Sequence, residues 1–344
     1  MRRQSIIFKA PFRIDIAEEV LPEPASNQVL IQTRFSAISH GTEMLIYRGR
    51  FPAEMAADEI IPEMQHPLHY PLKYGYAAVG DVIDIGSGVD PDLMGQTVFC
   101  LHPHESSFIA RADSVIPLPA DIDPGDALFL ANMETAVNLL MDGKPVIGEK
   151  VVVFGQGVVG LLTTSLLAEF PLGLLLTLEP IKLRREMSLK TGARLALDPT
   201  RADSEDQLVD QLGCGGAGDG ADLVYELSGN PNALEQAMAI TGFNGRIFIG
   251  SWYGDRPAAL DLGSRFHRQR LRLISSQVST LTPDLAARWS RQRRFDVAWD
   301  MIRRLRPSKF ISQWMPLSRA GEAYDLIDKD PAATIQLVLE YEHG

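Results

Sequence analysis

The stretch VVVFGQGVVG at residues 151–160 decides the fold of this chain of 344 residues. Four apolar residues lead into a Gly-x-Gly-x-x-Gly turn, and the chain then runs on without Gly or Pro until Pro171. This order predicts a buried parallel strand, a tight turn and the start of a helix. In such a turn Gly155 bends the chain, Gly157 lets a pyrophosphate approach the backbone, and Gly160 lets the helix pack against the strand.

The predicted helix start offers the N–H groups of Val158 and Val159, and its dipole, to phosphates. Residues 174–178, LLLTL, predict a second buried strand, and Glu179 stands at its end. An acid about 20 residues after the first glycine binds the adenosine ribose in dinucleotide-binding folds. We therefore predict a dinucleotide site. The alternative is an ordinary glycine-rich turn with Glu179 as a solvated acid at a strand end.

Glu179 also bears on which cofactor is bound. A carboxylate there accepts hydrogen bonds from both ribose hydroxyls and repels a 2′-phosphate, so we expect NAD rather than NADP. Lys182, Arg184 and Arg185 follow closely and could soften this preference, which keeps NADP possible.

The composition excludes several classes of partner. A formal net charge of −11 and a pI of about 5.2 disfavour binding to nucleic acid or to an anionic membrane surface. The arginine-rich stretches 265–272 and 288–294 are interpreted as solvated faces or an interface. The chain length favours two domains.

Two cysteines, Cys100 and Cys214, cannot build a disulfide framework or a four-cysteine zinc lobe. The first residues lack the features of a signal peptide, and no apolar run of about 18 residues exists. We therefore expect a cytoplasmic protein.

The pattern along the chain predicts the domain organisation. Residues 1–125 resemble short strands between turns, which indicates a compact, barrel-like β domain. From residue 126 strands and helices alternate, as in an α/β fold with a doubly wound parallel sheet. We expect the β-rich domain to comprise 1–138 and 277–344, with a Rossmann domain inserted at 139–276. Segment 51–71, which holds His66 and His69, is expected to be an irregular lid or loop.

This layout resembles the medium-chain dehydrogenase/reductase superfamily, which includes the zinc alcohol dehydrogenases. Five segments carry the resemblance: ISHGTE (38–43), KYGYAAVG (73–80), NMETAVN (132–138), YELSG (225–229) and FIGSWY (248–253). Some of their phrases are similar to a branch labelled zinc-binding or bacteriochlorophyllide dehydrogenase-like. The resemblance implies a GroES-like first domain, hydride transfer between nicotinamide and an alcohol, carbonyl or activated double bond, and a homodimer or homotetramer. It also implies that Ser228 and Ser251 stand at strand ends beside the cofactor.

The zinc ligands of that family are not matched. Ser39 stands where the first zinc cysteine is expected, and Tyr76 and Ala77 replace a His-Glu pair. A catalytic zinc needs three ligands of the His, Cys or carboxylate type. We therefore expect hydride transfer without zinc. The open alternative is a metal held by other side chains, and the candidate donors are His40, Glu43, His66, His69, His102, His104 and Glu134.

Without zinc, another group must stabilise the substrate oxygen or donate a proton. Tyr76 is the first candidate, and the alternative is a tyrosine that fills volume. His40 could relay a proton or contact the pyrophosphate. Glu43 could serve the relay or pair with an arginine such as Arg48. The predicted catalytic set is thus Tyr76, His40, Ser39 and Glu43.

Three further residues are expected to line the substrate pocket: Glu134, Trp252 and Tyr253. For each of them a purely structural role is the alternative. Two rival functions also stay open. One is a zinc alcohol dehydrogenase with unorthodox ligands, and the other is a sensor that binds a dinucleotide without turnover.

Overall fold

The computed structural model describes residues 1–52, 67–213 and 219–342. The chain divides into two compact units, Met1–Ala131 with Ile302–Gly344, and Asn132–Met301. The boundaries expected from the sequence, 138/139 and 276/277, lie inside the second unit. In the described ranges, no helix is long and apolar enough to cross a membrane.

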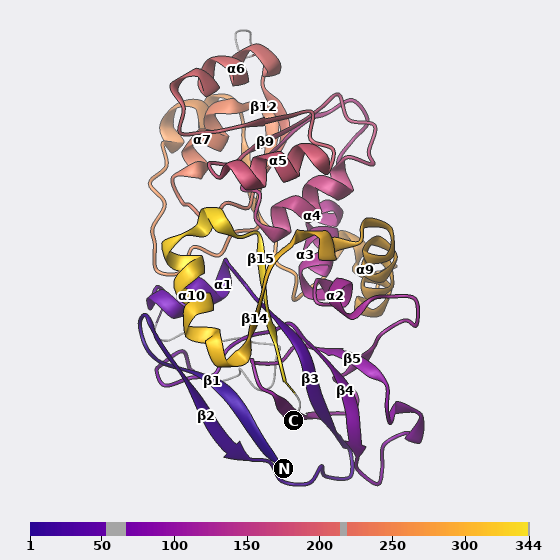
Figure 1. Cartoon of the computed structure of the whole chain (residues 1–344). Coiled ribbons are helices and arrows are strands. Elements are labelled where there is room, and N and C mark those ends of the chain that lie inside the picture. Colours follow the sequence, from indigo (N-terminus) through magenta and orange to yellow (C-terminus); the bar gives the residue numbers. More distant parts are fainter. Residues whose placement is uncertain (53–66, 214–218, 343–344) are drawn as a thin grey trace. The chain divides into compact units, whose positions relative to one another are not determined.

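A seven-stranded sheet forms the body of the first unit, in the order β14-β15-β3-β4-β5-β7, with β6 also paired to β3. Strand β3 (Gln28–Ile38) is its hub, because it runs antiparallel to β15, β4 and β6. The other strands are β4 (Ala78–Ile85), β5 (Thr97–Cys100), β6 (Ser107–Arg111), β7 (Ile116–Pro117), β14 (Ile311–Pro316) and β15 (Gln336–Glu340). Figure 1 shows the yellow strand β15 beside the indigo strand β3, so the two ends of the chain share one sheet.

A separate hairpin of β1 (Arg2–Ala10) and β2 (Arg13–Val20) completes the strands of this unit. Single bridges tie β1 to the loops that carry site residues, from Ser5 to Glu105 and from Phe8 to Leu72. The helices are α1 (Thr42–Arg48), α2 (Pro124–Ala127) and α10 (Ala320–Lys329). Helix α1 ends at Gly49, whose φ of 69° is the left-handed conformation that glycine adopts without a Cβ penalty.

The second unit is built on a six-stranded parallel sheet in the order β10-β9-β8-β11-β12-β13. Its strands are β8 (Lys150–Phe154), β9 (Leu174–Leu178), β10 (Leu195–Leu197), β11 (Ala221–Glu226), β12 (Thr241–Ile249) and β13 (Arg272–Ser275). Its helices are α3 (Leu130–Gly143), α4 (Val158–Leu167), α5 (Lys182–Lys190), α6 (Ala202–Leu212), α7 (Ala233–Ile240), α8 (Pro283–Ala286) and α9 (Arg291–Leu305). This strand order is that of two mononucleotide-binding halves joined at β8 and β11. The predicted doubly wound sheet is therefore confirmed.

The three glycines of the 155–160 turn differ in what they do. Gly155 has a φ of 82°, and a Cβ there would lie 2.5 Å from Ser228 Cα. A Cβ on Gly160 would lie 2.0 Å from the carbonyl oxygen of Gly155. Both glycines are thus required by the fold itself. A Cβ on Gly157 would meet nothing within 4 Å, so the structure leaves open space where a ligand could approach.

Strand β13 and helix α6 were not predicted. The residues around β13 are rich in arginine, and its four side chains are only half-buried or exposed because it is the outer strand of the sheet. An edge strand of this kind gives no apolar run for a sequence pattern to detect.

Candidate functional site

A candidate cofactor site lies in the second unit, at the carboxyl ends of the parallel strands. Helix α4 begins at Val158 directly after the turn, and its N-cap Gly157 makes no side-chain cap. The first N–H groups of a helix have no partner within the helix, so those of Val158, Val159 and Gly160 are oriented to bind an anion. The open space at Gly157 fits a pyrophosphate against these groups.

Glu179 directly follows β9, and its side chain is only 3% exposed. Its carboxylate accepts hydrogen bonds from the backbone N–H of Gln156 at 2.6 Å and of Ile181 at 2.9 Å. These bonds fix the carboxylate beneath the glycine turn. Glu179 is therefore not a freely solvated acid, and it stands where a ribose next to the pyrophosphate would meet it.

Glu226, at the end of β11, was missed by the sequence analysis and is fully buried. It accepts hydrogen bonds from the backbone N–H and hydroxyl of Ser228 and from the hydroxyl of Tyr253. Ser251 in turn accepts a bond of 2.9 Å from the N–H of Gly229. The structure thus places Ser228 and Tyr253 on one carboxylate, and Ser251 donates to the backbone carbonyl of the same glutamate at 3.3 Å.

The Tyr253 hydroxyl is a donor in this cluster. Burial, reinforced by the Glu226 carboxylate, raises the pKa of Tyr253 far above its ordinary value. The phenol therefore keeps its proton and orders the turn after β12. Its neighbour Trp252 is half-buried in the same turn. A substrate-pocket role for both remains a prediction.

A candidate catalytic cluster lies in the first unit, where β3 leads into α1. The Tyr76 hydroxyl donates a hydrogen bond of 2.5 Å to Ser39 Oγ. Both side chains are half-buried, so neither is sealed inside the core. The structure therefore joins two of the predicted catalytic residues into one hydroxyl pair.

Glu43, in the first turn of α1, is fully buried and supports the backbone of Ser39. Its Oε1 accepts the backbone N–H of Ser39 at 2.8 Å. Its Oε2 accepts the Tyr324 hydroxyl at 2.6 Å and lies 2.8 Å from His104 Nε2. The expected pairing of Glu43 with Arg48 is wrong, since Arg48 bonds to Asp328 at 2.6 Å.

His104 continues the hydrogen bonds away from Glu43. Its Nδ1 lies 2.7 Å from Ser36 Oγ, which lies 2.7 Å from the hydroxyl of Tyr341. Burial raises the pKa of both Tyr324 and Tyr341 well above the ordinary value, so both phenols stay protonated. A chain of hydrogen bonds thus runs from Ser39 through Glu43, His104 and Ser36 to Tyr341, which directly follows β15.

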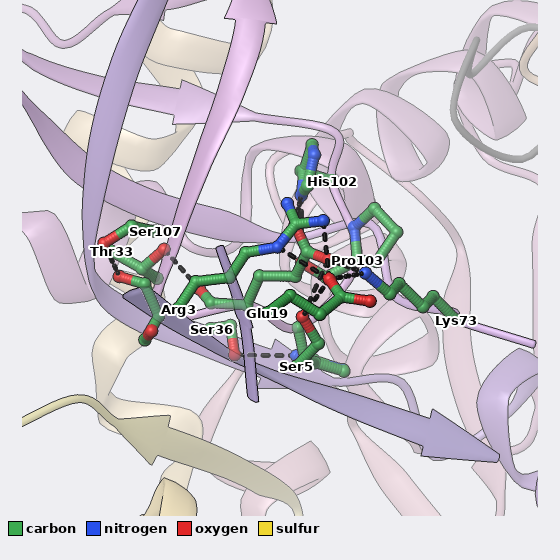
Figure 2. A network of polar contacts seen from close by, with 12 residues as sticks. Arg3, Ser5, Glu19, Thr33, Ser36, Lys73, His102, Pro103 and Ser107 are labelled. Atoms are coloured by element: carbon green, nitrogen blue, oxygen red, sulfur yellow. Dashed lines mark hydrogen bonds and ion pairs between the residues drawn. The ribbon is translucent and has the colours of Figure 1, made fainter. Parts of the chain in front are cut away.

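A charged cluster that includes Arg3, Glu19 and Lys73 anchors the loops that carry Tyr76 and His104 (Figure 2). Glu105, 2% exposed, accepts hydrogen bonds from Arg3 at 2.7 Å, Lys73 at 2.7 Å and Ser5 at 3.0 Å. Lys73 also bonds to Glu19 at 2.6 Å, and this contact lowers the pKa of Glu19. Because Lys73 precedes Tyr76 by three residues and Glu105 follows His104, the cluster positions both site loops.

The other histidines that the structure describes make separate contacts. His102 stacks on Phe108 with ring centroids 3.7 Å apart, and His69 bonds to the carbonyl of Pro67 at 3.0 Å. His40 is half-buried, and His66 lies outside the described residues. Among the described residues, no three His, Cys, Asp or Glu side chains gather as metal ligands would.

The family's zinc also does not fit the positions that match its ligands. Serine and tyrosine hydroxyls and an alanine stand there, whereas zinc sites in proteins use thiolate, imidazole or carboxylate. The hydroxyls of Ser39 and Tyr76 are bonded to each other. The reaction proposed for this chain therefore does not use zinc.

Glu134 has a partner that the sequence did not indicate. Its Oε1 accepts two hydrogen bonds from Arg294, at 3.0 Å and 2.7 Å. Arg294 is 1% exposed, so the interpretation of the whole 288–294 stretch as a solvated face or an interface is wrong at this residue. A buried arginine needs such a partner, and its partner lies 160 positions away in the chain.

No protein-family model matches the chain. It is 25% identical over 330 residues to the D-guloside 3-dehydrogenase of Escherichia coli (strain K12), which covers 91% of this chain and 92% of the relative. An alcohol dehydrogenase of Escherichia coli CFT073 complexed with NADH superposes with a TM-score of 0.78 at 17% identity, over 98% of this chain and 99% of the other. A zinc-binding dehydrogenase of Sinorhizobium meliloti 1021 bound to NADP gives a TM-score of 0.76 at 17% identity, over 99% of both chains.

These comparisons confirm the predicted class. The two solved structures show that the chain has the fold of the medium-chain dehydrogenases. The relative that aligns over 91% of the chain is itself a dehydrogenase. The chain has the fold of these dehydrogenases, and the comparisons support an NAD(P)-dependent oxidoreductase whose homologues act on small molecules.

Proposed function

We propose that the chain moves a hydride between NAD and a secondary alcohol or its ketone, with the substrate oxygen bonded by Tyr76 and Ser39 rather than by zinc. The observation that carries this proposal is the 2.5 Å bond between the Tyr76 hydroxyl and Ser39 Oγ. Two adjacent hydroxyls can both hydrogen-bond one substrate oxygen, which is the task that an electrophile must perform in this reaction.

A bound nicotinamide supplies the carbon that gives or takes the hydride. In the direction of ketone reduction, the Tyr76 hydroxyl gives its proton to the oxygen as the carbonyl carbon receives the hydride. Tyr76 Oη then regains a proton from water, and in the direction of oxidation the same proton transfers run in reverse. Ser39 holds the oxygen in place, because Glu43 fixes the Ser39 backbone through its N–H. His40 adjoins this pair, and its role as a proton relay or pyrophosphate contact remains a prediction.

NAD is the proposed cofactor. Glu179 is held rigidly beneath the turn by two backbone N–H groups, so its negative charge cannot swing away from a 2′-phosphate. The basic residues next to it are partly occupied. Arg185 bonds to the carbonyls of Glu179 and Pro180 and pairs with Asp198 at 3.1 Å. This arrangement supports NAD over NADP.

The sugar-derived substrate of the Escherichia coli relative suggests that a secondary hydroxyl on a sugar or polyol is oxidised here. The test is a panel of glycosides, polyols and simple secondary alcohols, assayed by NADH formation with the purified chain. Tyr76→Phe serves as the site variant and Tyr70→Phe as the matched control, because the Tyr70 hydroxyl donates to the Ile46 carbonyl and its ring packs on Phe51. Turnover lost in the first and kept in the second supports the proposal. NADH binding without turnover of any panel member favours the sensor.

A homodimer or homotetramer, built through the edge of the parallel sheet, and a cytoplasmic location are further proposals. In the described sheet β13 is the outer strand next to β12, and an outer strand can pair with a second copy. Light scattering on the purified protein gives its mass directly. A monomer at micromolar concentration contradicts the oligomer.

A further inference from the structure

A row of polar residues, buried at Glu134 and Asn138 and half-buried at Asp142, runs along one face of α3. Glu134, Asn138 and Asp142 are four residues apart, so their side chains share one side of the helix. Arg294 of α9 lies against this face and bonds to Glu134 twice and to Asn138 Oδ1 at 2.6 Å. Two residues of α3, Glu134 and Asn138, thus hold the guanidinium.

The same guanidinium also holds the segment 276–280, which follows β13. It donates to the carbonyl of Val278 at 2.5 Å and to that of Thr280 at 3.5 Å. Ser276, at the start of the segment, bonds to Asp142 at 2.6 Å and accepts from Asn138 at 3.2 Å. Segment 276–280 is therefore fixed at three points, to α3 through Ser276 and to Arg294 of α9 through the carbonyls of Val278 and Thr280.

The sheet order gives this segment a place in the cofactor site. The glycine turn follows β8, and the acid for the adenosine ribose follows β9. A dinucleotide lies across the carboxyl ends with its other half over the strands beyond the switch point, here β11, β12 and β13. The segment after β13 is therefore on the nicotinamide side, remote from the adenosine side at β9.

We propose that Arg294 is a positioning residue that holds segment 276–280 in place to receive the nicotinamide half of the cofactor. This inference rests on the proposed function, since it needs a dinucleotide at the strand ends. Arg294 acts through the carbonyls of the segment and through Glu134 and Asn138. It contributes no contact to the adenosine half.

The test compares two ligands that differ only in the nicotinamide half. ADP-ribose and NADH are titrated into the wild type and Arg294→Met. We expect the affinity for NADH to fall by about tenfold or more, a difference of about 1.4 kcal/mol, and the affinity for ADP-ribose to stay unchanged. Arg293→Met is the control, because Arg293 is exposed on the same helix and its guanidinium donates to the Arg288 carbonyl at 2.9 Å and lies over the Trp289 ring.

Arg294→Met removes both hydrogen bonds to the buried Glu134 carboxylate and leaves Arg291 at 3.7 Å as its ion-pair partner, which can prevent folding. The double variant Glu134→Leu with Arg294→Met replaces both charged side chains by apolar ones of similar volume. No charge is then left buried without its partner, and the titrations can be made on folded protein. We expect it to fold and to show the same selective loss for NADH, with partial recovery in Arg294→Lys. Equal affinities of variant and wild type for NADH, or an equal loss for NADH and ADP-ribose, overturns the inference. Failure of the wild type to bind either ligand instead overturns the proposed function.

Discussion

The hydroxyl of Tyr76 and Oγ of Ser39 form one hydrogen-bonded pair, 2.5 Å apart, at positions where related dehydrogenases are expected to carry zinc ligands. Glu43 fixes the backbone of Ser39, and Lys73 anchors the loop that carries Tyr76. The buried Glu43 carboxylate and the half-buried Lys73 ammonium group therefore position the two residues. This relationship is the basis of the reaction proposed for the chain.

We expect Tyr76→Phe and Ser39→Ala each to lower kcat by about 10²-fold, which is the usual contribution of a proton donor in this position. The double variant is expected to lose little more than the worse single variant, because both changes remove the same hydrogen-bonded unit. A double-mutant cycle on kcat measures this. Fully additive losses contradict the idea that the two hydroxyls act together.

Gly157→Asp is expected to abolish cofactor binding while leaving the fold intact, because a side chain there enters open space and its charge repels phosphate. Gly155→Ala is expected to lower the free energy of unfolding instead, since its φ of 82° and its contact with Ser228 leave no room for Cβ. NADH titration and thermal denaturation separate the two effects. Wild-type affinity in Gly157→Asp shows that the cofactor lies elsewhere.

Glu179→Ser is expected to lower the preference for NAD over NADP, because it removes the charge that repels a 2′-phosphate. The readout is the ratio of kcat/KM for the two cofactors, which is insensitive to a general loss of folded protein. Glu169→Ser, an exposed change in the same unit, is the control. An unchanged ratio in Glu179→Ser removes Glu179 from cofactor selection.

Asp142→Asn is expected to stabilise the protein at neutral pH. Burial raises the pKa of Asp142 above its ordinary value of about 3.9, against the opposing effect of Ser276, Asn138, Arg294 and Lys144. Its contribution to stability is therefore present below that value and is lost as pH rises through the raised pKa. The gain in Tm should be larger at about pH 7.5 than at about pH 4.5. An equal gain at both pH values contradicts this.

The sequence predicted the parts of the fold that depend on local patterns. The turn at residues 155–160, the strand 174–178 and Glu179 at its end are all encoded within about 25 residues, and each forms where expected. Strand β13 was missed because an outer strand has no apolar run.

The supporting residues of the site could not be predicted in this way. Glu43 meets His104 and Tyr324 across 61 and 281 positions of sequence, and Arg294 meets Glu134 across 160. No periodicity links such residues, because only the tertiary fold brings them together. One signal was available: a glutamate in an otherwise apolar first turn, as in TEMLIY at 42–47, indicates a buried and therefore partnered acid.

The most direct test of the central claim is to measure zinc content and turnover on the same protein, purified without chelator and then dialysed against EDTA. The account predicts far less than one zinc per chain and the same rate of NADH formation before and after dialysis. One zinc per chain, with activity lost on dialysis and restored by Zn²⁺, would contradict it.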